Sequence, residues 1–312
     1  MTAATVGGAV ANLAALAIMP FLLTGLINRV KALWSGRRGA PLLQPAHDVL
    51  RLLRKRPVYS ETTTPLFRIA PWIFLVTALG AAAIAPLLGA TPLASFRFDF
   101  VWLAYVWALG RVFVMLAALD TGSSFEGMGA AREATFATLL EPAYFLVTGA
   151  LCLVTHSHTL HQALTPDLAA GAEVVLVWAA AVVALVIVLQ VETARMPVDD
   201  PTTHLELTMV HEVMVLDHSG PDLAAIQTGA AVKLFVGCAL IATLLNPWAG
   251  TGTVAGAVAN LGLCAAVAVG VGTVESLVAR LKLRRVPLYI AIALVAGAIA
   301  LLATSWRAGG AP

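Results

Sequence analysis

Carboxylates within or beside apolar segments are the residues of this sequence best suited to do chemistry. Glu133 and Glu141 belong to one such segment, and Glu192 closes another. An ionisable side chain inside a membrane span costs about 2.5–3.5 kcal/mol on insertion scales, so its presence indicates a function or a buried partner. Burial raises the pKa of a carboxylate and lets it exchange protons near neutral pH. We therefore expect these three side chains to belong to a proton relay.

Cations near these carboxylates are the expected charge partners. Eight residues of helix turn through about 800°, which leaves Glu133 and Glu141 about 80° apart on one side. Arg132 precedes Glu133, and Arg195 follows Glu192 by three residues, within ion-pair reach. Two further charges, Arg111 in mid-span and Glu275 at the end of a span, are predicted to form packed interhelical ion pairs instead.

The stretch 192–220 is rich in acids and histidines. Pro197 and Pro201 prevent a continuous helix, and a helix is predicted from about Thr202. Histidines then recur every seven residues and share one stripe of such a helix. Because histidine and carboxylates titrate usefully near neutrality, the stretch is interpreted as a proton-handling loop at a subunit interface. Its candidate residues are Asp199, Asp200, His204, Glu206, His211, Glu212 and His218.

Two other interpretations of this loop stay open. His204, His211 and a carboxylate have a spacing that permits a metal site. A solvated polar helix with incidental histidines is the other alternative. The zinc-protease motif HExxH is absent, because Val215 stands where its second histidine would be.

The stretch 41–56, PLLQPAHDVLRLLRKR, predicts an amphipathic helix at the membrane surface. Its leucines and valine fall at helical spacing, while Gln44, Asp48 and Arg51 occupy the other face. The simplest interpretation is an interfacial anchor whose cations lie near anionic headgroups.

Composition places the chain in a lipid environment. Hydrophobic residues make up 60% and charged residues only 12%, against about 25% charge in soluble domains. The three cysteines form no CxxC pair, so we expect no iron–sulfur cluster or structural zinc held by this chain alone. Nucleic acid is a poor partner for its basic loop, which is short of aromatic residues.

Continuously apolar runs predict an all-α integral membrane protein with eight transmembrane helices. Of the 19 Lys and Arg residues, nine, one, one and four fall in the loops after the first, third, fifth and seventh spans. Those loops are therefore cytoplasmic, and the predicted topology is N-out and C-out. The expected spans lie near 7–28, 70–89, 100–119, 135–155, 171–191, 229–247, 252–274 and 286–304.

We expect a single membrane domain over residues 1–312. It divides into a first span (1–28), a cytoplasmic loop with the amphipathic helix (29–69), spans 2–5 (70–191), an acidic cytoplasmic loop (192–228), and spans 6–8 with the tail (229–312).

Three cytoplasmic loops resemble those of one membrane-subunit family. The string from Leu42 to Leu53 is similar to the first loop of the quinone-proximal membrane subunit of respiratory complex I (subunit 1 family) and of its homologue in membrane-bound hydrogenases. Arg132 precedes Glu141 by nine residues, as in that subunit, and the Arg132–Glu133 and Glu141–Pro142 pairs resemble the hydrogenase form. DTGSSFEGMG, upstream, also looks like the hydrogenase version.

The third loop gives the closest resemblance. DDPTTHLELTMVHE looks like the form found in group 4 [NiFe] hydrogenases and formate hydrogenlyase. Val198, Thr202 and His204 depart from the complex I pattern, which has a phenylalanine and glutamates at those positions. Those departures weaken a transfer of quinone chemistry.

The resemblance implies the membrane anchor of a multisubunit oxidoreductase in the cytoplasmic membrane. The implied partners are hydrogenase-like large and small subunits and iron–sulfur subunits on the cytoplasmic side, antiporter-like membrane subunits, and the lipid bilayer. The [NiFe] centre and the iron–sulfur clusters are expected in those partners, and this chain is expected to hold no complete redox site. Proton coupling would run through Glu133, Glu141, Glu192, Asp199, Glu206 and Glu212. Docking of the hydrophilic arm, or a quinone-like cavity, would involve Gln44, Pro45, Asp48, Arg51, Asp200, His204 and His211.

Two other functions stay open. A quinone-reducing complex I-type subunit predicts a chamber for a lipophilic tail between the loops. A stand-alone transporter with a carboxylate relay often has inverted repeats, and no such repeat is visible here.

Overall fold

The computed structural model describes residues 3–167, 169, 171–199 and 209–309. These residues form helices and no strand, and eight of the helices are long and apolar enough to cross a membrane. The prediction of an all-α protein with eight transmembrane helices is thereby confirmed. The eight are α1 (Ala3–Trp34), α3 (Pro65–Ile84), α4 (Asp99–Asp120), α5 (Ser124–Val154), α7 (Ala172–Glu192), α9 (Gly220–Leu245), α10 (Val254–Leu277) and α11 (Val286–Gly309).

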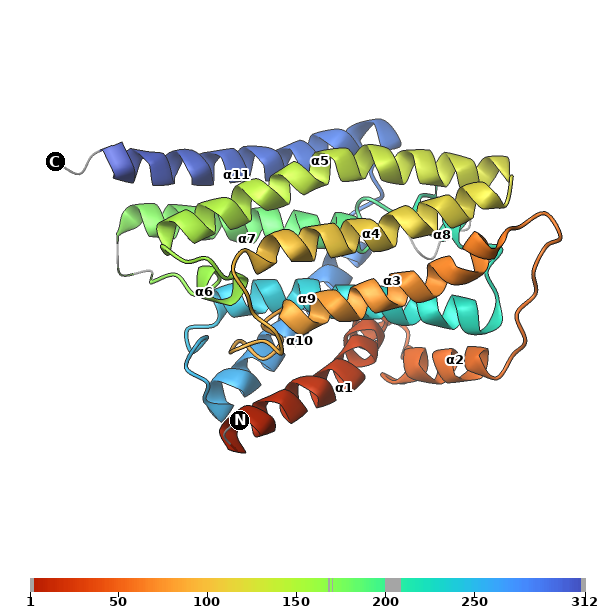
Figure 1. Cartoon of the computed structure of the whole chain (residues 1–312), viewed down its shortest axis with the longest axis horizontal. Helices are drawn as coiled ribbons and strands as arrows, with labels where there is room; N and C mark the ends of the chain where they lie inside the picture. Colours follow the sequence, from red (N-terminus) through yellow and green to blue (C-terminus); the bar gives the residue numbers. More distant parts are fainter. Residues whose placement is uncertain (1–2, 168, 170, 200–208, 310–312) are drawn as a thin grey trace.

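Four shorter helices lie in the connections: α2 (Gln44–Leu53), α6 (Leu160–Ala163), α8 (His211–Met214) and the 3-10 helix η2 (Leu283–Arg285). Both ends of the chain lie at one end of the bundle, whereas α2 and α8 lie at the opposite end (Figure 1). The basic loops all belong to that second end. Their charge predicts that this end faces the cytoplasm, and it is therefore called the cytoplasmic end.

Helix α9 forms the centre of the bundle. It packs against α1, α3, α7 and α10, and nearly all of its residues from Ala224 to Leu244 are buried. Helices α5, α7 and α11 pack together on one side, and α1 crosses the opposite side obliquely (Figure 1). A helix that is apolar all round is expected in such a central position.

Two of the long helices begin nine or more residues earlier than the hydropathy of the sequence predicts. Helix α5 begins at Ser124 rather than near residue 135, and α9 begins at Gly220 rather than near residue 229. Polar residues such as Glu126 and Asp222 lower the mean hydropathy of these first turns. Both side chains are nevertheless buried, because the cytoplasmic loops pack over them.

The amphipathic helix α2 is shorter than the predicted range 41–56. Val49 faces inward and is buried, while Leu50 and Leu53 are exposed beside the membrane-facing surface. Gly25 on α1 allows the approach to α2, because a Cβ there would overlap the carbonyl of Leu42. A helix held at this height, with leucines outward, is typical of an interfacial anchor.

A second glycine brings the third cytoplasmic loop against α5. A Cβ on Gly129 would overlap the side chain of Val213 and lie 2.9 Å from the backbone oxygen of Val210. Gly129 therefore permits the close packing that holds α8 over the start of α5.

Candidate functional site

Arg111, near the middle of α4, is the centre of a buried charge cluster. Its Nε lies 3.4 Å from Glu133 Oε1, its Nη1 lies 3.1 Å from Glu141 Oε1, and its Nη2 lies 2.7 Å from Glu192 Oε2. The guanidinium offers five N–H donors in a planar fork, so one side chain can serve carboxylates from several helices. Three predicted relay residues thus meet on one cation.

Lys233 on α9 extends this cluster. Its Nζ lies 2.6 Å from Glu192 Oε1, and its charge lies 5.4 Å from the ring centroid of Phe74 and 5.7 Å from that of Trp107. The Glu192 side chain is 3% exposed and lies between two cations. Because an unpaired charge in a bilayer is costly, this pairing holds Glu192 as a carboxylate.

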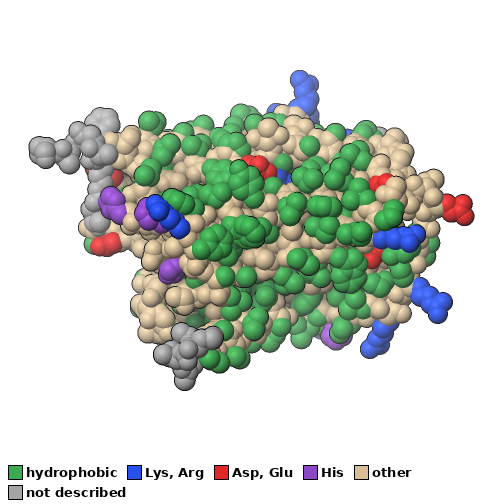
Figure 2. Space-filling view, viewed as in Figure 1, with side chains coloured by type: hydrophobic (Ala, Val, Ile, Leu, Met, Phe, Trp, Pro, Cys, Tyr) green, Lys and Arg blue, Asp and Glu red, His purple; other side chains and the backbone are tan. Residues whose placement is uncertain are grey.

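Glu141 differs from the other two carboxylates in being open to the side of the bundle. Its side chain is 37% exposed, against 15% for Glu133. It borders a cavity of about 600 Å³ on the outer surface of α4 and α5, with Arg111 at its inner wall. Figure 2 shows acidic and basic side chains adjoining within an otherwise hydrophobic face of the molecule. The cluster therefore reaches a lateral surface of the spanning region through Glu141.

Proline favours this opening. Pro142 follows Glu141 inside α5 and has no N–H to donate to the carbonyl of Thr138 one turn earlier. Thr138 and Pro142 both line the lateral cavity. The freed carbonyl adds an acceptor there, which suits ordered water beside Glu141.

A second group of charges lies toward the cytoplasmic end. Asp199 Oδ1 accepts a hydrogen bond of 2.8 Å from Arg280, and its Oδ2 accepts from the backbone N–H groups of Val210 and His211 at 3.0 and 3.1 Å. Asp199 is 1% exposed and closes the base of the third loop. Arg132 fixes the same segment from α5, because its Nη1 donates to the backbone oxygen of Met209 at 2.7 Å.

Between these groups and α2 lies a cavity of about 520 Å³, the cytoplasmic cavity. It lies where the first and third loops face one another across α1 and α9. Gln44 does not line it, but the Gln44 amide donates to Asp48 Oδ1 at 3.1 Å and orients that carboxylate. The predicted site residues that line it are Pro45, Asp48, Arg51, Arg195, Asp199, His211 and Glu212.

His211 connects the cytoplasmic cavity with the buried cluster. Burial, together with the neighbouring Lys233 and Arg111 cations and against the opposing effect of Glu192, lowers its pKa to about 4. His211 is therefore neutral at pH 7, and its ring is 6.4 Å from that of Phe74, which also packs near Lys233. A neutral imidazole can both accept and donate a proton.

The prediction that Arg195 pairs with Glu192 is wrong. Helix α7 ends at Glu192, and Ala194 has a left-handed backbone conformation with φ of 48°, so the chain turns away and helical spacing no longer applies. Arg195 Nη1 instead lies 3.3 Å from Glu275 Oε1 on α10. Lys31 of α1 binds the same carboxylate at 3.0 Å. Glu275 therefore forms the packed interhelical ion pairs that the sequence predicts.

The predicted histidine stripe is only partly testable. Asp200, His204, Glu206 and the expected helix start at Thr202 lie outside the described residues. Beyond them the helix is limited to His211–Met214, and His218 lies apart from it, stacked on Phe67 with ring centroids 3.9 Å apart. The described residues contain no group of three metal-ligating side chains, and the HxHxxH stretch from His156 forms none.

Sequence patterns alone do not assign a partner to Arg111 and do not single out Lys233. A mid-span cation is itself the available signal, because it requires an anion inside the bundle. Which of several carboxylates it reaches depends on the rotation of helices relative to one another, and Glu192 is 81 residues from Arg111. Lys31, at the end of the first span, looks like an ordinary flanking cation and carries no such signal.

An eight-span helical bundle with a buried charge cluster and a polar cavity at one end defines this chain as an integral membrane protein. The NADH dehydrogenase family profile matches residues 8–305. Hydrogenase-4 component C from Escherichia coli (strain K12) is 31% identical over 241 residues, which cover 77% of this chain and 75% of that protein. The chain belongs to the NADH dehydrogenase family, as a membrane subunit related to those of hydrogenase-4 and formate hydrogenlyase.

Two further relatives agree. Formate hydrogenlyase subunit 4 from the same strain is 28% identical and covers 73% of each chain. A subunit of the NADH-quinone oxidoreductase from Bordetella avium (strain 197N) is 30% identical over 39% of this chain and 34% of that protein. The predicted membership of this family is thus confirmed.

A solved structure shares the fold. A chain from the membrane-bound sulfane sulfur reductase, described as an archaeal respiratory membrane complex, superposes with a TM-score of 0.79 at 18% identity. The match covers 96% of this chain and 99% of that one.

Proposed function

We propose that this chain is the membrane-anchoring, proton-coupling subunit of a multisubunit membrane-bound [NiFe] hydrogenase or formate hydrogenlyase-like oxidoreductase in the cytoplasmic membrane. Its cytoplasmic end docks a hydrophilic arm that carries the nickel–iron and iron–sulfur centres. The relationship to hydrogenase-4 component C over three quarters of both chains supports this class of complex. The chemistry of this chain is limited to binding and proton movement.

One observation carries the coupling role: ionisable groups are found at the cytoplasmic cavity, around Arg111 and at a lateral opening. Asp199, His211 and Glu212 border or face the cavity at the loop. Glu133 and Glu192 follow around Arg111, and Glu141 completes the path at the surface of α5. Proton transfer needs groups within hydrogen-bond reach, directly or through water, and the Arg111 fork gathers three carboxylates at that scale.

Electrostatic coupling gives this path a way to respond to redox chemistry. Glu192 lies between Arg111 and Lys233, and Lys233 also depresses the pKa of His211 at the cavity. A negative charge that arrives near the cavity raises the proton affinity of His211 and of the nearby carboxylates. When that charge leaves, the proton affinity falls again, and protons move along this set of ionisable groups.

The lateral opening supports the proposal that the proton path continues in a neighbouring membrane subunit. Glu141 is the most exposed carboxylate of the cluster, and it lies within a spanning helix rather than at an aqueous end. An exposed charge facing lipid is unfavourable, so a partner with polar groups at this height is favoured over bare bilayer. An antiporter-like membrane subunit supplies such a partner.

A quinone-reducing subunit is the second candidate. The cytoplasmic cavity extends onto α1 at Phe21 and Thr24, within the spanning region, while Asp48 and His211 supply polar groups near its other end. A long amphipathic molecule could enter such a cavity from the lipid. The departures at Val198, Thr202 and His204 favour the hydrogenase class over this one.

The test is to isolate the complex from its native membrane in mild detergent and determine its subunits and metals. The proposal predicts nickel, iron–sulfur proteins and additional membrane subunits in stoichiometric amounts. Iron without nickel, together with bound quinone, would establish the second candidate instead. Recovery of this chain without other subunits would refute both candidates and favour the stand-alone transporter.

A further inference from the structure

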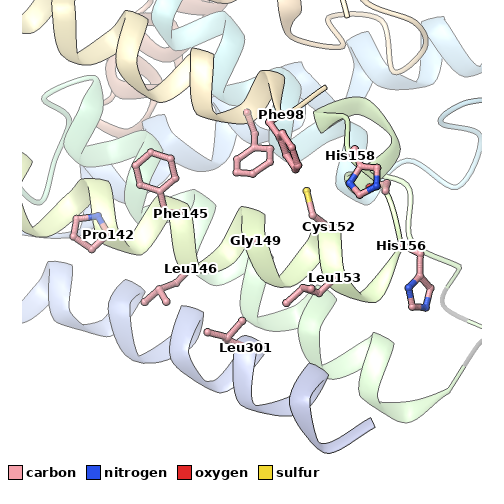
Figure 3. A pocket seen from close by; sticks show the side chains of 12 residues that line it. Phe98, Pro142, Phe145, Leu146, Gly149, Cys152, Leu153, His156, His158 and Leu301 are labelled. Atoms are coloured by element: carbon pink, nitrogen blue, oxygen red, sulfur yellow. The ribbon is translucent and has the colours of Figure 1, made fainter. Parts of the chain in front are cut away.

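An apolar cavity lies at the other end of the molecule from the cytoplasmic cavity. We call it the outer groove; it has a volume of about 810 Å³ and lies between α5, α11 and the start of α4. Phe145, Leu146, Leu153 and Leu301 line its length, and His156 and His158 stand at one end (Figure 3). Its lining includes no charged residue of the coupling path, although it includes Pro142, which follows Glu141.

The length of the outer groove matches one leaflet of the bilayer. From Pro142 to Val154, α5 rises about 18 Å at 1.5 Å per residue, against about 15 Å for half of the hydrocarbon core. A partner transmembrane helix would need an apolar surface about twice as long. The groove thus suits a chain that enters from the outer surface and ends at mid-membrane.

The rim of the outer groove carries donors and positive charge. The Arg97 guanidinium lies 4.9 Å from the ring centroid of Phe98, which lines the groove. The His158 ring packs edge-on against the same ring at 5.5 Å, and Arg97, His156 and His158 are all exposed. The acid nearest in sequence, Asp99, is fully buried and accepts from the backbone N–H of Leu160 at 2.6 Å.

The position of Arg97 runs against the charge pattern of the rest of the chain. Only Arg97 and Arg307 belong to the outer loops and tail of the predicted topology, whereas basic residues concentrate at the cytoplasmic end. A cation on the outer side works against the orientation rule. A specific anionic ligand gives it a reason to be there.

The backbone around the rim is strained. Phe98 and His156 have positive φ angles of 62° and 50°, and among the described residues only one other non-glycine residue, Ala194, shares this conformation. Such a conformation is strained and persists where surrounding contacts impose it, typically at binding sites. Here the Phe98 N–H donates to the His158 carbonyl at 2.7 Å, which locks the two sides of the rim together.

We propose that the outer groove binds an anionic phospholipid of the outer leaflet, with its phosphate at Arg97, His156 and His158 and an acyl chain along α5. Arginine recognises phosphate through paired N–H donors, and the apolar walls exclude water from the chain. A groove that is apolar below a basic rim matches the amphiphilic build of such a lipid. The bound lipid seals the space between α4, α5 and α11 on the outer side of the membrane.

The native thiol of Cys152 reports on occupancy of the outer groove. Cys152 lines the groove and is partly exposed, whereas Cys238 and Cys264 are fully buried. The intact complex is stripped of lipid in detergent, then supplied with phosphatidylglycerol or phosphatidylcholine, and treated with N-ethylmaleimide. Mass spectrometry of the Cys152 peptide gives the labelling rate. Phosphatidylglycerol at about ten times its dissociation constant is expected to slow labelling by about tenfold, and phosphatidylcholine much less.

Two variants with a matched control complete the test. Arg97→Gln is expected to abolish the difference between the two lipids. Gly149→Phe should fill the groove and prevent lipid binding, because a Cβ at Gly149 meets nothing within 4 Å. Gly262→Phe on α10 has equally open surroundings away from the groove, and should leave protection of Cys152 unchanged.

Four results would overturn the proposal. Equal protection by both lipids would mean that the groove does not recognise an anionic headgroup, and a preference for phosphatidylglycerol that survives Arg97→Gln would mean that Arg97 does not bind that headgroup. Absence of protection by any lipid would mean that no lipid occupies it. Protection in the fully delipidated complex would assign the groove to a partner chain.

Discussion

The Nζ of Lys233 lies 2.6 Å from Oε1 of Glu192, although the two residues are 41 positions apart and belong to different helices. Both side chains are almost completely buried, at 7% and 3% exposure. The pair joins the central helix α9 to α7 at the point where Arg111 of α4 also arrives. Three helices are thus tied by one carboxylate, which makes Glu192 as much a structural residue as a candidate proton carrier.

Removal of both members of this pair should cost less than the sum of the two single removals. Lys233→Met leaves three carboxylates to one cation, Arg111, and Glu192→Gln leaves the ammonium buried without its carboxylate. Each single change is expected to cost about 3–5 kcal/mol. The double variant should recover part of that loss, with a coupling energy of about 0.5–3 kcal/mol.

Thermal unfolding of the purified complex measures these differences. Arg51→Gln is a suitable control, because its ion pair with Asp48 is exposed, with the Arg51 side chain at 70% exposure. Surface pairs contribute about 0–1 kcal/mol, so this variant should unfold near the wild-type temperature. Strictly additive losses in the double variant would contradict the pairing of Lys233 with Glu192.

Close packing of the third loop on α5 should be sensitive to a single methyl group. Gly129→Ala forces a Cβ toward the Val210 carbonyl and the Val213 side chain, and such overpacking costs about 1–3 kcal/mol. The expected result is weaker retention of the hydrophilic subunits, measured by their ratio to this chain after purification.

The control for that change lies two residues away. A Cβ on Gly127 meets only Leu119 at 3.9 Å, so Gly127→Ala should fit and stabilise the helix by about 0.5–1 kcal/mol. If both variants retained the hydrophilic subunits equally, the account of Gly129 as the contact point of the loop would be wrong.

His218 should make the protein less stable in acid. Burial lowers its pKa to about 4, although the neighbouring carboxylates of Asp222 and Asp217 oppose the shift. Its ring lies against Phe67, with an interplanar angle of 10°, and its Nδ1 has no hydrogen-bond partner among the described residues. Below about pH 6.5 the unfolded chain therefore binds a proton that the folded chain does not, and stability falls until about pH 4.

The measurement is the unfolding temperature at about pH 7.5 and about pH 5. His218→Phe preserves the stacked ring and removes the titrating group, so it should lose part of the pH dependence. His211 shifts in the same direction and accounts for a remaining part. An unchanged pH dependence in His218→Phe would show that the imidazole is not responsible.

The long helices were predictable because their cause is local. Continuous apolar runs near 20 residues specify spanning helices, and all eight are present. The amphipathic spacing around Val49 likewise specifies α2. The early starts of α5 and α9 were not predictable, since Glu126 and Asp222 read as polar loop residues until the packing of distant loops buries them.

The ion pairs were less predictable because they depend on helix rotation and on turn geometry. Glu133 and Glu141 share one side of α5, as their spacing predicts, and both reach Arg111. The Arg195–Glu192 pairing failed because one left-handed residue, Ala194, redirected the chain. A rule for residues three apart holds only while the helix continues.

The central claim is that Glu141 moves protons between the buried cluster and the lateral face. The direct measurement is proton movement per redox turnover by the complex in sealed vesicles, for wild type, Glu141→Gln and the exposed control Glu173→Gln. Glutamine keeps the size of the side chain and loses its proton exchange, so the account predicts normal assembly with proton movement per turnover reduced about tenfold or more. The control should behave as wild type. Wild-type proton movement per turnover in Glu141→Gln would contradict the coupling role.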